Sequence, residues 1–217
     1  MSKLQAVLFD IDGTLLDNNE YHKKAWMQYL KDQGKEITDQ DFIEYISGRT
    51  NKDAVEHLYG EMTEEESKKH YLKKEEIYRQ MYQPHIAPID GLTEFLKELK
   101  KHNIMMALAT SGIQENIDFM FKHVPIQQYF KEIIQMKDVE KGKPEPEIFL
   151  KTAEAVQVPA ENCIVFEDSI SGVQAGKAAG MKVVALTTTH SPEELHEADL
   201  VIKDFTEINF QRLTTLV

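Results

Sequence analysis

The stretch Phe9-Asp10-Ile11-Asp12-Gly13-Thr14-Leu15 decides how this chain folds, because it joins an apolar run to two carboxylates and a turn. The run before it, Ala6-Val7-Leu8, is typical of a buried β-strand. If the backbone stays nearly extended, Asp10 and Asp12 share one side, and Gly13 permits a sharp turn. An Asp-Gly turn alone explains Asp12 and Gly13, but not a second acid at the end of a buried strand, where an unpaired charge is costly. A cation site explains both acids.

Short apolar runs recur along the chain with helical segments between them. Most are too apolar to be strands with one face in solvent. Strands that are covered on both faces and alternate with helices form a parallel sheet. We therefore predict an α/β fold with a doubly wound parallel sheet. The predicted strands are Ala6 to Phe9, Met105 to Ala109, Ile133 to Ile134, Ile164 to Phe166, Val183 to Leu186 and Leu200 to Ile202.

The stretch from about Leu16 to about Pro88 interrupts this alternation. It is rich in Lys and Glu and has no comparable strand run. Residues 20–30 place apolar side chains on one helical face, and Glu64 to Met81 predicts a long charged helix or a helix pair, whose charges are most simply a solvated face. We therefore expect an α/β core formed by residues 1–15 and 89–217, with residues 16–88 inserted as a helical domain.

A second acidic pair, Glu167-Asp168, closes the predicted strand Ile164 to Phe166 and is followed by Ser169. Helix capping is the simpler explanation, and one of these residues can serve it, but capping does not require three polar groups in a row after a buried strand. Metal ligation explains them better. Hard oxygen ligands from two strand ends suit Mg²⁺, which takes a few carboxylates together with water and phosphate oxygens.

Two further segments carry groups that bind phosphate. Thr110-Ser111-Gly112 follows a predicted strand, and its hydroxyl and the amides of the next helix can hold a phosphate oxygen. Lys143 precedes Pro144 at a predicted helix start and can reach inward as a fixed positive charge. Each signal is weak alone. Their order along the chain, after Asp10 and before Glu167, makes the whole set specific.

Composition narrows the range of partners. The chain has 217 residues and a formal net charge of −12, which would repel nucleic acids and anionic membranes. No apolar run approaches the roughly 18 residues of a membrane-spanning helix. The short polar start does not resemble a secretory signal, so we expect a cytoplasmic protein, and we expect a monomer. The single cysteine, Cys163, lies in an apolar run and is predicted to be a buried core residue.

The motifs resemble those of the haloacid dehalogenase superfamily over the whole chain. The four superfamily motifs match Asp10/Asp12, Thr110, Lys143 and Glu167/Asp168 in order, and the helical insertion is similar to the superfamily's cap of the first (C1) type. Within the superfamily, the chain looks closest to the branch of beta-phosphoglucomutases and phosphoglycolate phosphatases. The resemblance implies a phosphotransferase with a Rossmann-like core, dependent on Mg²⁺, that acts on a small phosphorylated metabolite.

The resemblance also implies roles for the core residues. Asp10 attacks phosphorus to form an aspartyl-phosphate, and Asp12 protonates the departing oxygen. The metal is held by the Asp10 carboxylate, the Asp12 backbone carbonyl and Asp168. Glu167 is either a metal ligand itself or a residue that holds the ligands in place. The phosphoryl group is bound by Thr110 and Lys143, with Ser111 and Gly112 beside them.

The helical insertion carries the candidates for selecting the leaving group. The segment that begins at Glu20 is similar to the beta-phosphoglucomutase cap, whose matching histidine is His22 here, and Lys74 falls near a cap lysine. A packed or solvated histidine is an equally good interpretation of His22. Mutases carry an arginine where this chain has Asn51, whereas Arg49 follows Gly48 as in phosphatase relatives.

Differences after the second motif favour a hydrolase. Mutases carry Ser and Asn there, and this chain has Gly112 and Gln114. We therefore expect a phosphomonoester hydrolase acting on a substrate similar to a sugar phosphate, with a sugar phosphomutase as the alternative. A 2-haloacid dehalogenase would not need Asp12, and a non-catalytic phosphometabolite-binding protein should have lost Asp10 or Asp12. Both are ranked lower.

Overall fold

The computed structural model describes residues 4–46 and 50–217. By its internal contacts the chain divides into two compact units, one formed by Met1–Asp17 and Ala87–Val217 and one by Asn18–Ile86. The first contains a six-stranded sheet in the order β3-β2-β1-β4-β5-β6, and every pairing is parallel. The predicted doubly wound α/β fold is confirmed.

All six predicted strands are present, with small changes at their ends. They are β1 Ala6–Phe9, β2 Met105–Thr110, β3 Glu132–Gln135, β4 Cys163–Glu167, β5 Lys182–Leu186 and β6 Leu200–Ile202. The helices of this unit are α5 Leu92–Lys101, α6 Gln114–His123, α7 Glu147–Ala155, α8 Ile170–Ala178 and α9 Phe210–Leu213. Four short 3₁₀ turns complete the described part of this unit, at Gln127–Tyr129, Met136–Asp138, Ala160–Asn162 and Phe205–Glu207.

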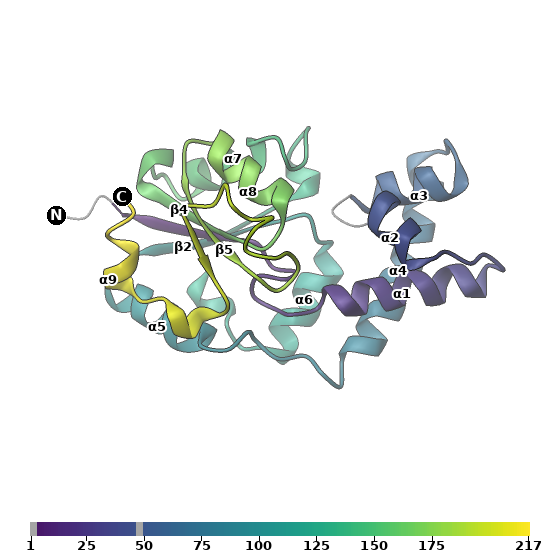
Figure 1. Cartoon of the computed structure of the whole chain (residues 1–217), viewed down its shortest axis with the longest axis horizontal. Coiled ribbons are helices and arrows are strands. Elements are labelled where there is room, and N and C mark those ends of the chain that lie inside the picture. The colour runs from purple at the N-terminus through teal and green to yellow at the C-terminus, as the bar shows by residue number, and fades with distance from the viewer. Residues whose placement is uncertain (1–3, 47–49) are drawn as a thin grey trace. The chain divides into compact units, whose positions relative to one another are not determined.

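Helices cover both faces of the sheet, which explains why most strand residues are apolar. Figure 1 shows α7 and α8 on one face and α5 and α9 on the other. Successive side chains of β1 point to opposite faces. Leu8 packs in the cluster that contains Phe149 of α7, whereas Phe9 meets Phe95 of α5 edge-on, with ring centroids 6.4 Å apart. Cys163 is fully buried in β4, as predicted.

The helical unit differs from the predicted range by two residues at each end. Its helices are α1 Asn19–Asp32, α2 Asp39–Tyr45, α3 Asn51–Tyr59 and α4 Glu64–Tyr82. Leu16 forms bridges with Asp12 and with Pro88, which ties both connecting segments to the sheet unit. Of the two possibilities for Glu64 to Met81, a long helix or a helix pair, the structure shows a single helix, α4. None of the described helices is long and apolar enough to span a membrane.

Local sequence explains where three of these helices begin. Thr38, Thr50 and Thr63 each form a capping box with an acidic residue three positions later. The apolar face of α1 is buried, with Trp26 only 3% exposed. Most charges of α4 are solvated, as predicted, but Lys74 and Glu75 are both buried.

Candidate active site

The polar residues predicted from the core motifs gather where adjacent strands end. Asp10 follows β1, Thr110 is the last residue of β2, and Glu167 is the last residue of β4, with Asp168 next. The strand order places β1 between β2 and β4, so these three ends are neighbours. Asp10 is 7% exposed and Asp168 is 3% exposed, so both carboxylates are largely removed from water.

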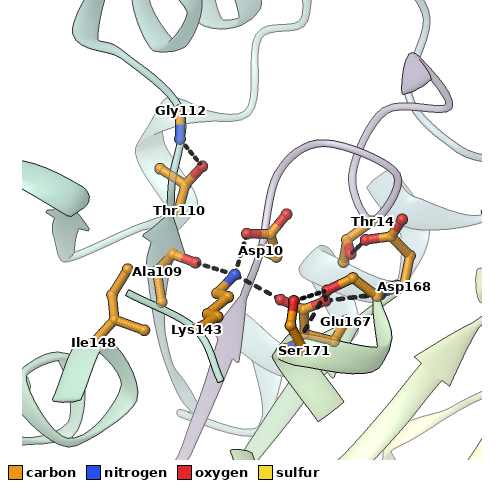
Figure 2. A network of polar contacts seen from close by, with 12 residues as sticks. Asp10, Thr14, Ala109, Thr110, Gly112, Lys143, Ile148, Glu167, Asp168 and Ser171 are labelled. Carbon is orange, nitrogen blue, oxygen red and sulfur yellow. Dashed lines mark hydrogen bonds and ion pairs between the residues drawn. The ribbon is translucent and has the colours of Figure 1, made fainter. Parts of the chain in front are cut away.

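Lys143 lies at the centre of this group, as Figure 2 shows. Its Nζ donates to Asp10 Oδ1 and to Glu167 Oε1, both at 2.5 Å, and to the carbonyl of Ala109 at 3.3 Å. The lysine comes from the segment before α7, and its peptide bond to Pro144 is cis. One ammonium therefore links the ends of β1, β2 and β4.

Glu167 is fully engaged by protein groups. Its Oε1 accepts from Lys143, and its Oε2 accepts from the Asp168 amide at 3.0 Å and from the amide and hydroxyl of Ser169, both at 2.9 Å. Ser169 also caps α8 through the amide of Gly172. A Cβ at Gly172 would lie 1.9 Å from the Glu167 carboxyl carbon, so glycine is required for this packing. Of the two roles expected for Glu167, this geometry favours holding other residues in place.

Asp168 presents its carboxylate between two loops. Its Oδ1 accepts a hydrogen bond from the hydroxyl of Thr14 at 3.3 Å, and its Oδ2 accepts one from the hydroxyl of Thr189. Figure 2 shows Thr14 and Asp168 beside one another at the edge of the site. Ser169 therefore serves as the helix cap, and Asp168 stays a candidate ligand for a cation.

Asp12, Thr110 and Gly112 surround a second part of the site. The Gly112 amide donates to Thr110 Oγ1 at 2.9 Å. A Cβ built on Gly112 would lie 3.1 Å from Thr110 Oγ1 and 3.5 Å from Asp12 Oδ2, so the three residues lie close together. Asp12 is half-buried, and Ser111 is exposed. The structure thus brings the second predicted aspartate toward the predicted phosphate-binding segment.

Negative charge dominates the site. The Lys143 ammonium pairs with Asp10 and Glu167, and Asp12 and Asp168 add two further carboxylates close to Asp10. Burial raises the pKa of Asp10 to about 7; Lys143 opposes this shift, while Glu167 and Asp12 add to it. Burial also raises the pKa of Asp168 well above its usual range, with help from Glu167 and Asp10. For Lys143, the two carboxylates outweigh burial and raise its pKa.

This charge imbalance fits a divalent cation. Within residues 4–46 and 50–217, no three side chains of the His, Cys, Asp or Glu type form a group that could hold a metal by themselves. Mg²⁺ does not need such a group, because it keeps several waters and binds through one or two carboxylates and substrate phosphate. Asp10 and Asp168 are buried carboxylates at adjacent strand ends and meet that requirement.

The predicted residues of the helical unit form a separate buried cluster. Glu75 Oε1 accepts from Lys74 Nζ at 2.6 Å and from Asn51 Nδ2 at 2.8 Å. His22 Nδ1 lies 3.3 Å from Lys74 Nζ and 3.6 Å from Glu75 Oε2, and its ring stacks on Tyr78 at a centroid distance of 3.7 Å. His22, Lys74 and Asn51 are thus brought together. Arg49 lies outside the described residues.

Sequence reasoning did not identify several residues of these two clusters. The sequence motifs give Thr14 no role of its own and do not include Thr188 or Thr189, and the charge pattern of α4 predicts a solvated Glu75. The position of Thr188 and Thr189 in the loop after β5 could have identified them, because ligands bind at the carboxyl ends of parallel strands. The sequence of α4 contains so many charged residues that it does not indicate which of them, such as Glu75, is buried.

Comparisons with known proteins show what this chain is similar to. A family model described as "Haloacid dehalogenase-like hydrolase" matches residues 7–186. Validoxylamine A 7'-phosphate phosphatase of Streptomyces hygroscopicus subsp. limoneus is 30% identical, over 96% of this chain and 98% of the relative. Beta-phosphoglucomutase of Bacillus subtilis (strain 168) is also 30% identical, over 97% and 94%. A crystal structure of a family IA, variant 3 hydrolase from Entamoeba histolytica HM-1:IMSS has a TM-score of 0.90 and 33% identity, over 98% of this chain and 99% of that one.

Proposed function

This chain belongs to the haloacid dehalogenase-like hydrolase family, and from that premise we propose that it is a Mg²⁺-dependent phosphomonoesterase. Its substrate is a small phosphorylated metabolite similar to a sugar phosphate, and the reaction passes through an aspartyl-phosphate on Asp10. The observation that carries the proposal is the position of Lys143, held between Asp10 and Glu167 with Asp168 at the next position. The cytoplasmic location and the monomeric state stay predictions of the sequence.

The proposed reaction has two displacements at phosphorus. In the first, a carboxylate oxygen of Asp10 forms a bond to phosphorus while the bond to the ester oxygen breaks, and Asp12 gives that oxygen a proton. In the second, Asp12 takes a proton from water, whose oxygen attacks the aspartyl-phosphate and releases inorganic phosphate and free Asp10. Lys143 and the segment Thr110–Gly112 hold the phosphoryl oxygens.

The resemblance to the family implies which residues bind the metal. Asp10 and Asp168 would hold Mg²⁺ with their carboxylates, together with the backbone carbonyl of Asp12. Bound Mg²⁺ would supply positive charge that offsets the charge of the phosphate oxygens. Glu167 holds Lys143 and the start of α8 in place, which is consistent with the engagement of both its oxygens.

Two side-chain arrangements support a hydrolase over a phosphomutase. The relatives include a phosphatase and a mutase at equal identity, so they do not separate the two reactions. The Asn51 amide donates to Glu75. Gln114 is engaged by Gln135 at 2.6 Å and by Asp118 at 2.9 Å. The side-chain amides of Asn51 and Gln114 are therefore both engaged by residues of their own unit. A mutase would need groups at these positions to bind a second phosphate.

We propose that residues 16–88 act as a cap that selects the leaving group.

Purified protein tests the main proposal. With Mg²⁺ and a panel of small phosphate esters, we expect release of inorganic phosphate, and we expect Asp10→Asn and Asp12→Asn each to lower kcat by orders of magnitude. Asp17→Asn, at an exposed position just after the motif, is the matched control and should leave the rate unchanged. Full activity of Asp10→Asn would refute the mechanism.

A second assay separates the two reactions. The enzyme is given a β-hexose 1-phosphate together with the corresponding 1,6-bisphosphate, and both 6-phosphate and free phosphate are measured. A phosphomonoesterase should release phosphate without rapid formation of the 6-phosphate. Fast isomer formation with little free phosphate would instead assign the chain to the phosphomutases.

A further inference from the structure

The loop that follows β5 contacts two of the strand ends that carry the site, those of β1 and β4. Thr188 donates its hydroxyl to the Gly13 carbonyl at 2.5 Å, in the turn directly after Asp12. Thr189 donates its hydroxyl to Asp168 Oδ2, directly after β4. The loop itself is fixed at its start, where the Thr187 amide donates to the Ile202 carbonyl at 3.0 Å. Two consecutive side chains therefore bind groups at two different strand ends.

The contact with Asp168 controls the orientation of its carboxylate. Thr14 holds Oδ1 from the β1 loop and Thr189 holds Oδ2 from the β5 loop, so rotation of the carboxylate would break one of the two hydrogen bonds. Hydroxyl donors of this kind also favour the ionised form that a cation requires. Asp168 itself is only 3% exposed, so protein groups form most of its surroundings.

We propose that Thr189 is a positioning residue, which holds the Asp168 carboxylate in the orientation that binds Mg²⁺. This inference rests on the proposed function, because it gives Asp168 the role of a metal ligand. Groups that hydrogen-bond to metal ligands commonly change metal affinity by 10–100-fold when they are replaced. Thr189 is itself exposed. Water can take part of its place, and the effect therefore belongs at the lower end of that range.

The test removes the Thr189 hydroxyl in a variant of nearly the same side-chain size. Thr189→Val removes it, Thr189→Ser retains it, and Thr187→Val makes the same change in the same loop, where the backbone amide that fixes the loop is kept. Binding of Mg²⁺ alone is measured by calorimetry. We expect the dissociation constant for Mg²⁺ to rise about tenfold in Thr189→Val. In Thr189→Ser and Thr187→Val it should stay close to that of the wild type.

Kinetics provide a second readout that a purely structural role would not give. In Thr189→Val, the Mg²⁺ concentration for half-maximal rate should rise about tenfold while kcat at saturating Mg²⁺ changes little. Wild-type Mg²⁺ affinity in Thr189→Val would overturn the inference, and so would an equal loss of affinity in Thr189→Ser. If the wild type hydrolyses esters with Mg²⁺ while Thr189→Val is unchanged, only this inference fails. If the wild type neither binds Mg²⁺ nor releases phosphate, the proposed function fails as well.

Discussion

The two units each bury a cluster of charged side chains, and the clusters differ in their balance of charge. In the sheet unit, Lys143 faces the carboxylates of Asp10, Glu167 and their two acidic neighbours. In the helical unit, Lys74 faces one carboxylate, that of Glu75, at 2.6 Å. The cluster in the sheet unit therefore has more carboxylates than ammonium groups. In the helical unit, the charges of Lys74 and Glu75 balance each other.

This difference separates a binding site from a structural contact. Buried charges are costly unless they are paired and hydrogen-bonded. The pair in the helical unit meets that condition by itself, with Asn51 as an additional donor to Glu75. The sheet unit leaves an excess of carboxylates that a cation can neutralise. Four predictions test this comparison.

The largest effect should follow from Lys143→Met. The change removes the ammonium that pairs with Asp10 and Glu167, and it leaves their carboxylates without that partner. We expect kcat to fall by about 10³-fold, similar to the loss of a main group that stabilises charge in a transition state. The measurement is the rate of phosphate release at saturating Mg²⁺. Loss of less than tenfold would mean that Lys143 is a structural ion pair like Lys74.

Lys74→Met should instead lower stability, and only that of the helical unit. Removal of the lysine leaves Glu75 buried with weaker partners, and breaking such a pair should cost about 3 kcal/mol. The single tryptophan, Trp26, lies in α1, and the single cysteine, Cys163, lies in β4. Tryptophan fluorescence in urea therefore follows the helical unit, and thiol labelling follows the sheet unit.

The control for this prediction is the double variant Lys74→Met, Glu75→Gln. It removes both charges and keeps an oxygen to accept from Asn51, so most of the lost stability should return. Burial raises the pKa of Cys163 to about 12, so its thiol should stay unreactive while the sheet unit is folded. Rapid labelling of Cys163 in Lys74→Met would show that the two clusters are not independent.

The elements of the fold were easier to predict from the sequence than the partners within each cluster. Each strand contains a short apolar run, so all six could be located, and the carboxyl ends of β1 and β4 indicated Asp10 and Glu167. Hydrogen-bond partners depend on which loops meet after folding. Thr189 is 21 positions from Asp168, and Asn51 is 24 positions from Glu75, and no local pattern connects either pair.

Addition of Mg²⁺ should stabilise the sheet unit and leave the helical unit unchanged. A ligand at a hundred times its dissociation constant adds about 2.7 kcal/mol to the free energy of unfolding. We expect Cys163 labelling to slow when Mg²⁺ is added, and we expect Asp168→Asn to abolish this effect. Thermal unfolding of Lys74→Met should respond to Mg²⁺ as the wild type does. A response to Mg²⁺ that survives in Asp168→Asn would place the cation elsewhere.

The smallest effects should come from two glycine substitutions, one in each unit. A Cβ at Gly112 would lie 3.1 Å from Thr110 Oγ1 and 3.5 Å from Asp12 Oδ2, so these groups must shift by a few tenths of an ångström. Gly34 has nothing within 4 Å of its Cβ position, but its φ of +71° strains any other residue. Gly112→Ala should therefore lower kcat by about tenfold and hardly change stability. Gly34→Ala should lower stability by about 1 kcal/mol and leave kcat unchanged. Measured melting temperatures and rates that reversed this pattern would remove the distinction between a glycine that lies beside the reacting groups and a glycine that only permits a turn.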